Sequence, residues 1–524
     1  MTLKSPSVSV LAMPRNAVIG VDIGTSSSKG VLVGLDGTLI RSATREHTPA
    51  RPGPGHFEMD AAVWWREFVE LARELTGSGD TASGDTASGD TVADGAASGD
   101  TTVVAVGVSG MGPCVLLADE HDTPLRPAVL YGVDTRSVQQ IRRIEAWLGA
   151  EEIIRRCGSA LTTQAAGPKI AWIAEEEPEV YARARRLYMP SSWLVRKLTG
   201  NYVLDHHSAS QCTPLYDTLA GEWYAPWAAK VAPGIELPPL RWPGDAAGAL
   251  TTEAAEATGL PAGIPVTTGT IDAWAEALSV GAQHIGDLML MYGTTMFLIH
   301  TVPKPLTSPS LWGTVGALPG TRNLAGGMAT SGAVANWLRD LFTDGDHAEL
   351  TALATESGAG ANGLLMLPYF SGERTPIMDP DARGVIAGLT LSHTRGDLYR
   401  AALEATGFGV RQNIEVIEAA GGDIRRVVAV GGGTQGSLWT QIVSDITGRP
   451  QELRTITIGA GYGDALLAAQ LVGDASIEDW NPVRETVTPR AEHTGRYDEL
   501  YTLYRRLYPD TAATVHALAA LQER

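Results

Sequence analysis

The sequence contains little cysteine, few aromatic residues and fewer cations than anions. Three cysteines, Cys114, Cys157 and Cys212, are widely spaced along 524 residues. This spacing fits neither a zinc site nor a secreted disulfide framework, so we expect a reducing, cytoplasmic compartment. The formal net charge of −19 argues against a nucleic-acid or anionic-membrane partner, because both are themselves negatively charged. No apolar run approaches the roughly 20 residues of a transmembrane helix.

What remains is the composition of a globular protein, with 44 % hydrophobic and 19 % charged residues. The length exceeds what one core usually supports, so two domains are expected. Residues 1–15 are interpreted as a loose tail. Between residues 77 and 101 the motif Ser-Gly-Asp-Thr recurs with almost no large apolar residue. Such a segment cannot offset its ordering entropy, which predicts a flexible surface insertion rather than a calcium-binding repeat.

Residues 18–33 consist of two apolar, β-branched runs around a short polar turn, a pattern that predicts a buried hairpin. Glycine lets the backbone approach a ligand, and consecutive N–H groups in a turn can bind an anion. Asp22 precedes the turn, where a carboxylate beside bound phosphates would suit Mg²⁺. A purely structural hairpin is the alternative. The candidate phosphate-binding residues are Gly24, Thr25, Ser26 and Lys29.

A second polar turn between apolar strands follows at residues 288–299. When the two turns are aligned on their glycines, Met291 falls where Asp22 stands, so the carboxylate belongs to the first copy alone. Two such hairpins from two domains would grip one nucleotide between them. A third turn, rich in glycine, joins an apolar strand to a helix. The candidate nucleotide contacts in these two turns are Gly293, Thr294, Thr295, Gly432, Gly433 and Gln435.

In their order along the chain, these turns resemble the FGGY family of carbohydrate kinases, which is built on the actin/Hsp70-like ATPase fold. The resemblance runs from about residue 16 to about residue 472 and is interrupted by the insertion. It implies an α/β protein whose two ribonuclease-H-like domains, residues 16–280 and 281–524, flank a central cleft. In this cleft ATP, with Mg²⁺ held by Asp22, would meet a small sugar.

Asp272 stands in a Gly-Thr-Ile-Asp turn at the start of a predicted helix. Taken alone, such an aspartate is usually a helix cap. The resemblance implies another role, because FGGY kinases place their catalytic base in this Gly-x-x-Asp turn. Asp272 would then accept the proton of the sugar hydroxyl. Lys29 is either a phosphate contact or a solvated lysine of the hairpin.

Two loops, residues 109–114 and 131–136, are expected to hold the substrate, because ligands of open α/β sheets bind beyond the carboxyl ends of strands. The candidate substrate contacts are Gly110, Met111, Asp134, Arg136 and Asp272. A salt bridge between Asp134 and Arg136 is the structural alternative. Xylulokinase-like members, which the chain resembles most, carry Met-His and Trp-Asn-Asp in these loops, and here the histidine and the Trp-Asn are absent.

The resemblance therefore predicts a pentulose such as xylulose or ribulose, and leaves open an erythritol- or glycerol-like polyol or a sugar acid. It is compatible with a homodimer. The alternative from another class is a non-catalytic, actin-like nucleotide switch. Such a switch needs Asp22 and the phosphate turns but no base facing a sugar, so Asp272 distinguishes the two. A simple ATPase would need no sugar loop.

Overall fold

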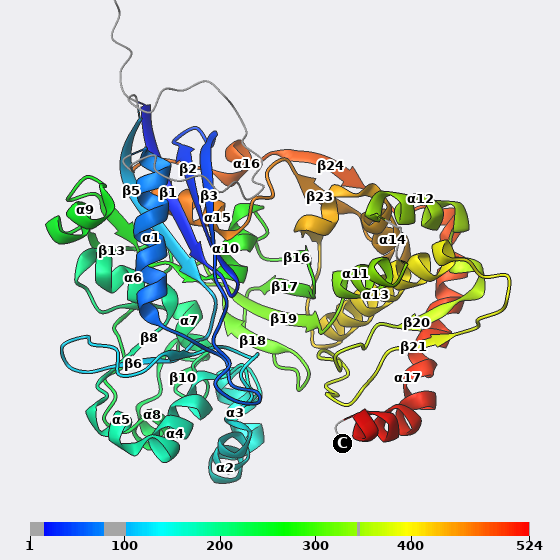
Figure 1. Ribbon diagram of the computed structural model, residues 1–524, viewed down its shortest axis with the longest axis horizontal. Coiled ribbons are helices and arrows are strands. Elements are labelled where there is room, and N and C mark those ends of the chain that lie inside the picture. Colours follow the sequence, from blue (N-terminus) through cyan, green and yellow to red (C-terminus); the bar gives the residue numbers. More distant parts are fainter. Residues whose placement is uncertain (1–14, 78–100, 343–345, 523–524) are drawn as a thin grey trace, which may run out of the picture.

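The computed structural model describes residues 15–77, 101–342 and 346–522. The chain forms two α/β halves that lie side by side, each around a seven-stranded mixed sheet (Figure 1). Within the described ranges, no helix combines the length and the apolar character needed to cross a membrane. The predicted N-terminal tail, apart from Arg15, and the predicted insertion, apart from Gly77 and Thr101, lie outside the described residues.

The first sheet contains the hairpin predicted at residues 18–33. The order of its strands brings residues that are far apart in the sequence to the same edge. Its order is β13-β14-β5-β1-β2-β3, with β15 also beside β5. Strands β1, β2 and β3 are antiparallel, whereas β5 runs parallel to β1, so the carboxyl ends of β1 and β5 lie at one edge. The strands are β1 (Arg15–Ile23), β2 (Ser27–Gly34), β3 (Leu39–Glu46), β5 (Thr101–Gly110), β13 (Ala246–Ala249), β14 (Pro265–Thr267) and β15 (Thr270–Ile271).

Helices cover both faces of this sheet. On one face α1 (Ala61–Thr76) begins at Asp60, which accepts a hydrogen bond from the Ala62 N–H at 2.8 Å, and it buries Trp64 and Phe68. Its neighbours there are α6 (Pro190–Thr199) and α9 (Thr252–Thr258). The other face is covered by α10 (Asp272–Ser279) and by α15 (Ala460–Gln470), which comes from the far end of the chain.

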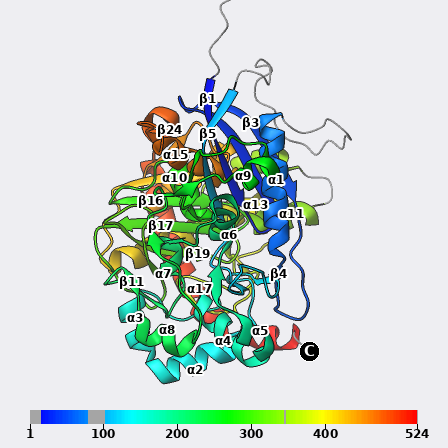
Figure 2. The same ribbon diagram turned by 90° about the vertical axis from the view of Figure 1, so that its left-hand side faces the viewer.

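A mainly helical region lies below the first sheet and has its own apolar core (Figure 2). Its helices are α2 (Val138–Leu148), α3 (Ala150–Cys157), α4 (Ala166–Glu176), α5 (Pro178–Arg183), α7 (His206–Ser210) and α8 (Ala225–Val231). Short strand pairs tie the loops together: β4 (Glu58–Met59) with β7 (Ala128–Val129), β6 (Leu116–Ala118) with β8 (Arg186–Tyr188), β9 (Leu204–Asp205) with β12 (Leu240–Arg241), and β10 (Tyr216–Asp217) with β11 (Glu222–Trp223).

The second sheet has the order β18-β19-β17-β16-β22-β23-β24. Its strands are β16 (Asp287–Tyr292), β17 (Met296–Val302), β18 (Trp312–Val315), β19 (Arg322–Met328), β22 (Arg426–Val430), β23 (Gln451–Arg454) and β24 (Val483–Val487). The helices around it are α11 (Gly332–Leu341), α12 (His347–Ser357), α13 (Arg395–Ala419), α14 (Ser437–Thr447) and α17 (Thr494–Gln522), with the strand pair β20 (Leu365–Leu367) and β21 (Val385–Ala387). The short helix α16 (Ile477–Trp480) packs instead with α15 against the first sheet.

The halves are joined at several places, including the edge strand β18 and helix α15. The edge strand β18 is hydrogen-bonded to the helical region, because Gly313 N donates to Gly158 O at 3.1 Å and Val315 N donates to Ser210 Oγ at 3.2 Å. Helix α15 lies within the range assigned to the second domain but packs on the first sheet. There Tyr462 donates its hydroxyl proton to Gly37 O at 2.8 Å, and a Cβ on Gly107 would come within 2.0 Å of Asp464 O.

Candidate active site

The carboxyl ends of neighbouring strands bring the key side chains together. In the parallel pair of β1 and β5, Asp22 lies opposite Ser109, and Ser109 in turn lies opposite Thr270 of β15. Asp272 follows β15 directly, as the first residue of α10. The sheet therefore places Asp22 and Asp272 at one edge, although 250 positions separate them in the sequence.

A serine hydroxyl links two carboxylates at this edge. Ser109 Oγ lies 3.0 Å from Asp22 Oδ1 and 2.7 Å from Asp464 Oδ2. One hydroxyl has one proton, so both contacts are hydrogen bonds only if a carboxyl group carries a second proton. Burial raises the pKa of Asp464 well above its ordinary value. Burial thus favours the protonated form of Asp464.

Besides Asp464, three carboxyl groups crowd this edge, and burial raises the pKa of each of them. Burial, with repulsion from Asp272, raises the pKa of Asp22 to about 8, and burial raises the pKa of Asp272 to about 6. Burial also raises the pKa of Glu276, four residues further along α10, to about 7, although the Lys29 ammonium opposes this rise. Buried carboxylates of this kind favour a bound cation.

Asp272 is oriented by the start of its helix. It occupies the first helical position, with Ile271 as the N-cap residue, so it is not the capping residue itself. Its Oδ1 accepts a hydrogen bond from the Ala273 N–H at 2.7 Å. In the described part of the chain the Asp272 carboxylate has no other hydrogen-bond partner. One carboxylate oxygen therefore remains available to a ligand.

The first predicted phosphate turn is rigid. Gly24 N donates to Ser27 O at 3.0 Å, and a Cβ on Gly24 would lie 2.8 Å from the same oxygen, so the turn requires glycine. His47 Nε2 donates to Gly24 O at 3.0 Å, while His47 Nδ1 lies 2.9 Å from the buried Glu67 carboxylate. The Thr25 hydroxyl lies 2.9 Å from the Tyr131 hydroxyl. Ser26 and Lys29 are exposed.

The second predicted turn rests on a helix N-terminus. Gly332 N donates to Gly293 O at 3.0 Å, and the N–H groups of Ser331 and Ala333 donate to Thr294 O at 3.0 and 3.1 Å. The start of α11 thus donates hydrogen bonds to the carbonyl groups of the turn. The side chains of Thr294 and Thr295 are exposed.

The third turn lies beside the second. Strands β16 and β22 are parallel, with Met291 opposite Val430, so the residues that follow them share one edge of the second sheet. Gly432 and Gln435 are exposed, Gly433 is partly exposed, and a Cβ on Gly432 would meet nothing within 4 Å. The predicted nucleotide contacts are therefore gathered at one open edge.

The two predicted substrate loops are more enclosed than expected. Gly110 and Met111 are buried, and Met111 N donates to Ile23 O at 2.7 Å. The Asp134 carboxylate accepts hydrogen bonds from Phe57 N at 2.6 Å and from Arg136 Nε at 2.9 Å. The structure thus brings Asp134 and Arg136 together as a buried ion pair, and their contact with substrate stays a prediction.

Gln164, which spacing did not single out, joins these loops. Its Nε2 donates to Gly112 O at 3.1 Å and its Oε1 accepts from Gly132 N at 3.1 Å. It also lines a small cavity of about 20 Å³ between the helical region and the second sheet. Thr162, Gln211, Trp312 and Thr314 line the same cavity. In the ligand-free protein this space holds about one water molecule, and its polar lining makes it the candidate sugar site.

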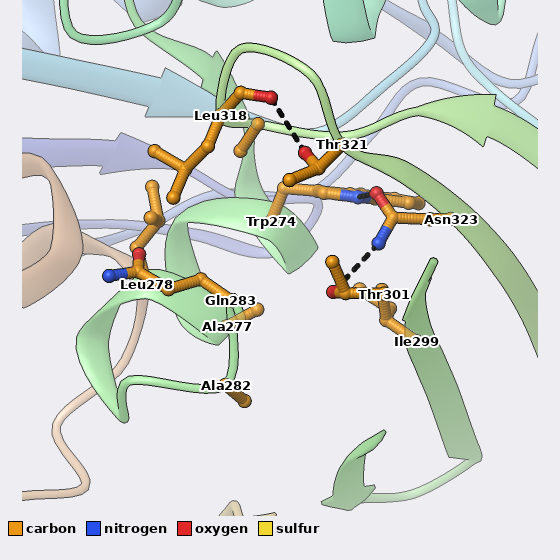
Figure 3. Close-up of a pocket in the computed structure, with 11 residues that line it drawn as sticks. Trp274, Ala277, Leu278, Ala282, Gln283, Ile299, Thr301, Leu318, Thr321 and Asn323 are labelled. Carbon is orange, nitrogen blue, oxygen red and sulfur yellow. Dashed lines mark hydrogen bonds between the residues drawn. The ribbon is translucent and has the colours of Figure 1, made fainter. Parts of the chain in front are cut away.

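A second, smaller cavity, of about 10 Å³, lies on the other side of α10 (Figure 3). At roughly 100° per residue, Trp274 and Leu278 project away from Asp272 and Glu276. Trp274 Nε1 donates to Asn323 Oδ1 at 2.9 Å, and Asn323 Nδ2 donates to Thr301 Oγ1 at 3.0 Å. This cavity separates α10 from β17 and β19 and is distinct from the carboxylate edge.

Other site residues also escaped sequence reasoning. Glu276 had a usable signal, because it follows Asp272 by four positions and so shares its helix face. Asp464 follows a glycine-rich stretch, but nothing in the spacing links it to Ser109. Tyr131 begins the predicted substrate loop of residues 131–136 but was not itself singled out, and Arg374 comes from a loop with no motif for this chemistry.

Similarities to known proteins cover nearly the whole chain. The N-terminal domain of the FGGY family of carbohydrate kinases matches residues 17–279, and the C-terminal domain matches residues 288–471. A xylulose kinase of Escherichia coli (strain K12) is 29 % identical, with 94 % of this chain and 98 % of the relative covered. A ribulokinase of Mycolicibacterium smegmatis is 31 % identical, with coverages of 94 % and 93 %. The crystal structure of a xylulose kinase from Rhodospirillum rubrum, 32 % identical, covers 95 % of this chain and 100 % of its own, with a TM-score of 0.85.

Proposed function

The chain belongs to the FGGY family of carbohydrate kinases, and we propose that it transfers the γ-phosphate of ATP to a hydroxyl group of a pentulose. The observation that carries this proposal is the meeting of Asp22, Asp272 and the phosphate turn at one sheet edge. A nucleotide switch would need the turn but not a buried base with a free oxygen beside it.

The reaction is a simple displacement. The sugar oxygen forms a bond to the γ-phosphorus, the bond from that phosphorus to the β–γ bridging oxygen breaks, and ADP leaves. Asp272 receives the hydroxyl proton, for which its free carboxylate oxygen and its pKa of about 6 are suitable at neutral pH. The remaining catalysis is positioning and charge stabilisation.

The phosphate groups would lie between the two hairpin turns. Backbone N–H groups near Gly24, Thr25 and Ser26 would face them from the first half, and those near Gly293, Thr294 and Thr295 from the second. Adenosine would lie over Gly432, Gly433 and Gln435, where an added Cβ on Gly432 meets only open space.

A magnesium ion fits the residues at the first turn. Among the described residues no three His, Cys, Asp or Glu side chains are arranged to hold a metal alone. Mg²⁺ needs only one or two carboxylates, since phosphate oxygens and water supply its other ligands. Asp22 would hold it, and the buried Asp464 Oδ1, which has no hydrogen-bond partner, lies behind Ser109. When bound, the ion would neutralise charge on the transferred phosphoryl group.

The substrate assignment draws on the pocket and on the relatives. The cavity near Gln164 offers amide and hydroxyl groups, which suit a polyhydroxylated chain, and the Trp312 ring, which suits its C–H face. Relatives that span nearly the full chain are named for xylulose and for ribulose phosphorylation. A pentulose satisfies both observations, and Asp134 with Arg136 would position it through the loop that they fix.

A screen tests the proposal. ADP release would be measured by a coupled assay across ketoses, polyols and aldonates, with wild type and Asp272→Asn in parallel. We expect one or two pentuloses to stimulate ADP release strongly. The variant should lose about 10²–10⁴-fold in kcat while ATP binding stays nearly intact, because the base acts only in the chemical step. If no compound stimulates the wild type, the protein is a nucleotide switch. If Asp272→Asn turns over at the wild-type rate, Asp272 is not the catalytic base.

A further inference from the structure

The loop of residues 371–376 carries an arginine into the space between the two halves. Glu373 Oε1 accepts hydrogen bonds from Ala329 N and from Arg374 N, both at 2.7 Å. Thr375 Oγ1 donates to Asn413 Oδ1 at 2.7 Å. These contacts fasten the loop to the end of β19 and to α13, so the Arg374 backbone is held on both sides.

The Arg374 side chain is connected to both phosphate turns through its neighbours. Its Nη2 donates to Met328 O at 2.7 Å, and Met328 pairs with Met296, the residue that follows the second turn. The segment after Met328 reaches that turn directly, because Ser331 N donates to Thr294 O. Towards the first half, burial raises the pKa of Tyr131 and the nearby Arg374 guanidinium opposes this rise. Tyr131 is the residue whose hydroxyl contacts Thr25.

The positive charge of Arg374 has no ion-pair partner in the described part of the chain. Its Nε is buried and makes no hydrogen bond. Burial raises the pKa of the neighbouring Glu373 to about 7, so this carboxyl group neutralises the arginine only partly at neutral pH. A buried guanidinium with unused donors is costly unless an anion binds it.

We propose that Arg374 binds the transferred phosphoryl group and stabilises its charge in the transition state. The inference rests on the proposed kinase function and adds a catalytic residue from the second half. The first side of the site supplies the carboxyl groups Asp272, Asp22 and Glu276, whereas Arg374 supplies a guanidinium from the opposite side. A guanidinium has planar donors that match phosphate oxygens, and an arginine in this role contributes about 10³–10⁵-fold to kcat in other phosphoryl-transfer enzymes.

Arg374→Ala and Arg374→Lys test this role, with Arg383→Ala as the matched control. Arg383 belongs to the same connection between β20 and β21, but it bonds Gln522 and the carbonyl groups of Pro380 and Ala382. We expect Arg374→Ala to lose about 10²–10³-fold in kcat, with KM values for ATP and pentulose within about threefold of wild type. Arg374→Lys should be intermediate, since it keeps the charge but loses the planar donors.

Two readouts separate this role from a structural one. Added guanidinium should restore at least tenfold of the kcat lost by Arg374→Ala. With pentulose present, aluminium fluoride, which mimics the transferred phosphoryl group, should make wild type retain ADP but not Arg374→Ala. A kcat within threefold of wild type, or undiminished retention of ADP with aluminium fluoride, would overturn the proposal. So would a lowered melting temperature together with a loss that guanidinium does not restore.

The role of Arg374 can also be tested if the protein does not phosphorylate a sugar. If no sugar or polyol stimulates the wild type, slow ATP hydrolysis replaces sugar phosphorylation as the readout, with water as acceptor of the same phosphoryl group. Arg374→Ala should then reduce hydrolysis in a similar proportion, while Arg383→Ala leaves it unchanged. Equal hydrolysis by wild type and Arg374→Ala would reject the arginine role independently of the substrate.

Discussion

The two polar hairpins share a backbone plan but differ in chemistry. In both, an apolar strand leads through a glycine turn into an antiparallel partner. The first turn is braced by His47 and Glu67 and has Asp22 at its start. The second is braced by backbone N–H groups of α11 and has Met291 at the matching position.

The two halves therefore offer different chemical groups to a ligand. The first half concentrates carboxylates, which suit a cation and a proton acceptor, and it is closely packed around them. The second half presents neutral N–H groups, exposed threonines and open glycines, which suit a nucleotide that enters and leaves. In the proposed kinase the first half would supply the base and the metal ligand, and the second half would supply most of the nucleotide contacts.

We expect the largest effect when the carboxylate is removed from the first turn and placed in the second. Asp22→Asn should lower kcat about 10²–10³-fold and weaken its Mg²⁺ dependence, because metal stabilisation of phosphate charge is worth several kcal/mol. Adding Met291→Asp should not restore activity, because the residue opposite Met291 is Val430, which cannot form the hydrogen bond that Ser109 forms with Asp22. Steady-state kinetics over a range of magnesium concentrations measure both effects. Unchanged kcat together with unchanged Mg-ATP affinity in Asp22→Asn would contradict the assignment.

The second prediction concerns the sugar side of the first half. Asp134→Asn should raise the KM for the pentulose by about 10–100-fold and leave the KM for ATP nearly unchanged, because a charge-assisted contact or the loop that it fixes is lost. Breaking a buried ion pair also costs about 3–5 kcal/mol of stability, so kinetics must be measured well below the melting temperature.

Glu58→Gln is the matched control for Asp134→Asn. It weakens the other carboxylate partner of Arg136, which lies 2.7 Å away, and spares Asp134. If both variants lower the melting temperature but Asp134→Asn alone raises the sugar KM, Asp134 acts on the substrate. Loss of ATP affinity instead would assign Asp134 to the nucleotide.

A third prediction uses the base itself. Asp272 must be ionised to accept a proton, and burial raises its pKa to about 6. At saturating ATP, kcat/KM for the sugar should therefore fall roughly tenfold per pH unit below about 6 and level off above about 7. The residual activity of Asp272→Asn should lack this acidic limb. A wild-type profile that stays flat down to pH 5 would show that another group is the base.

The smallest effects should come from single methyl groups in the turns. Gly432→Ala meets only open space in the ligand-free protein, so its melting temperature should stay unchanged. Its KM for ATP should rise about fivefold if adenosine lies there, a change of about 1 kcal/mol. Gly24→Ala, whose Cβ would lie 2.8 Å from Ser27 O, should lower the melting temperature as well. If Gly432→Ala binds ATP as tightly as wild type, adenosine does not lie over Gly432.

The features that sequence reasoning could recover are those with local signals. Alternating apolar strands and glycine turns predicted both hairpins and the turn after β22, and the resemblance predicted the two α/β halves. The rule that ligands lie beyond the carboxyl ends of strands directed attention to the loop of residues 109–114, but nothing in the sequence predicted that Ser109 would lie opposite Asp22.

Contacts between distant segments had no such signal. Ser109 and Asp464 are 355 positions apart, and no spacing relates them. Gln164, Tyr131 and Arg374 are likewise ordinary polar residues until the fold brings two loops or two halves together. The buried ion pair of Asp134 and Arg136 was foreseen as an alternative, but its degree of enclosure depends on Phe57 and Glu58 from another loop.

The crossing of α15 onto the first sheet has a consequence for synthesis of the chain on the ribosome. Tyr462 contacts Gly37 across 425 positions. At roughly 5–20 residues per second, this interval corresponds to about 20–85 s of translation. Throughout that time the face of the sheet that α15 later covers, which includes Val18, Val31 and Ala105, lacks its partner. The first half therefore completes its core only after α15 has been synthesised, and an apolar face that stays uncovered for that long favours aggregation of the nascent chain.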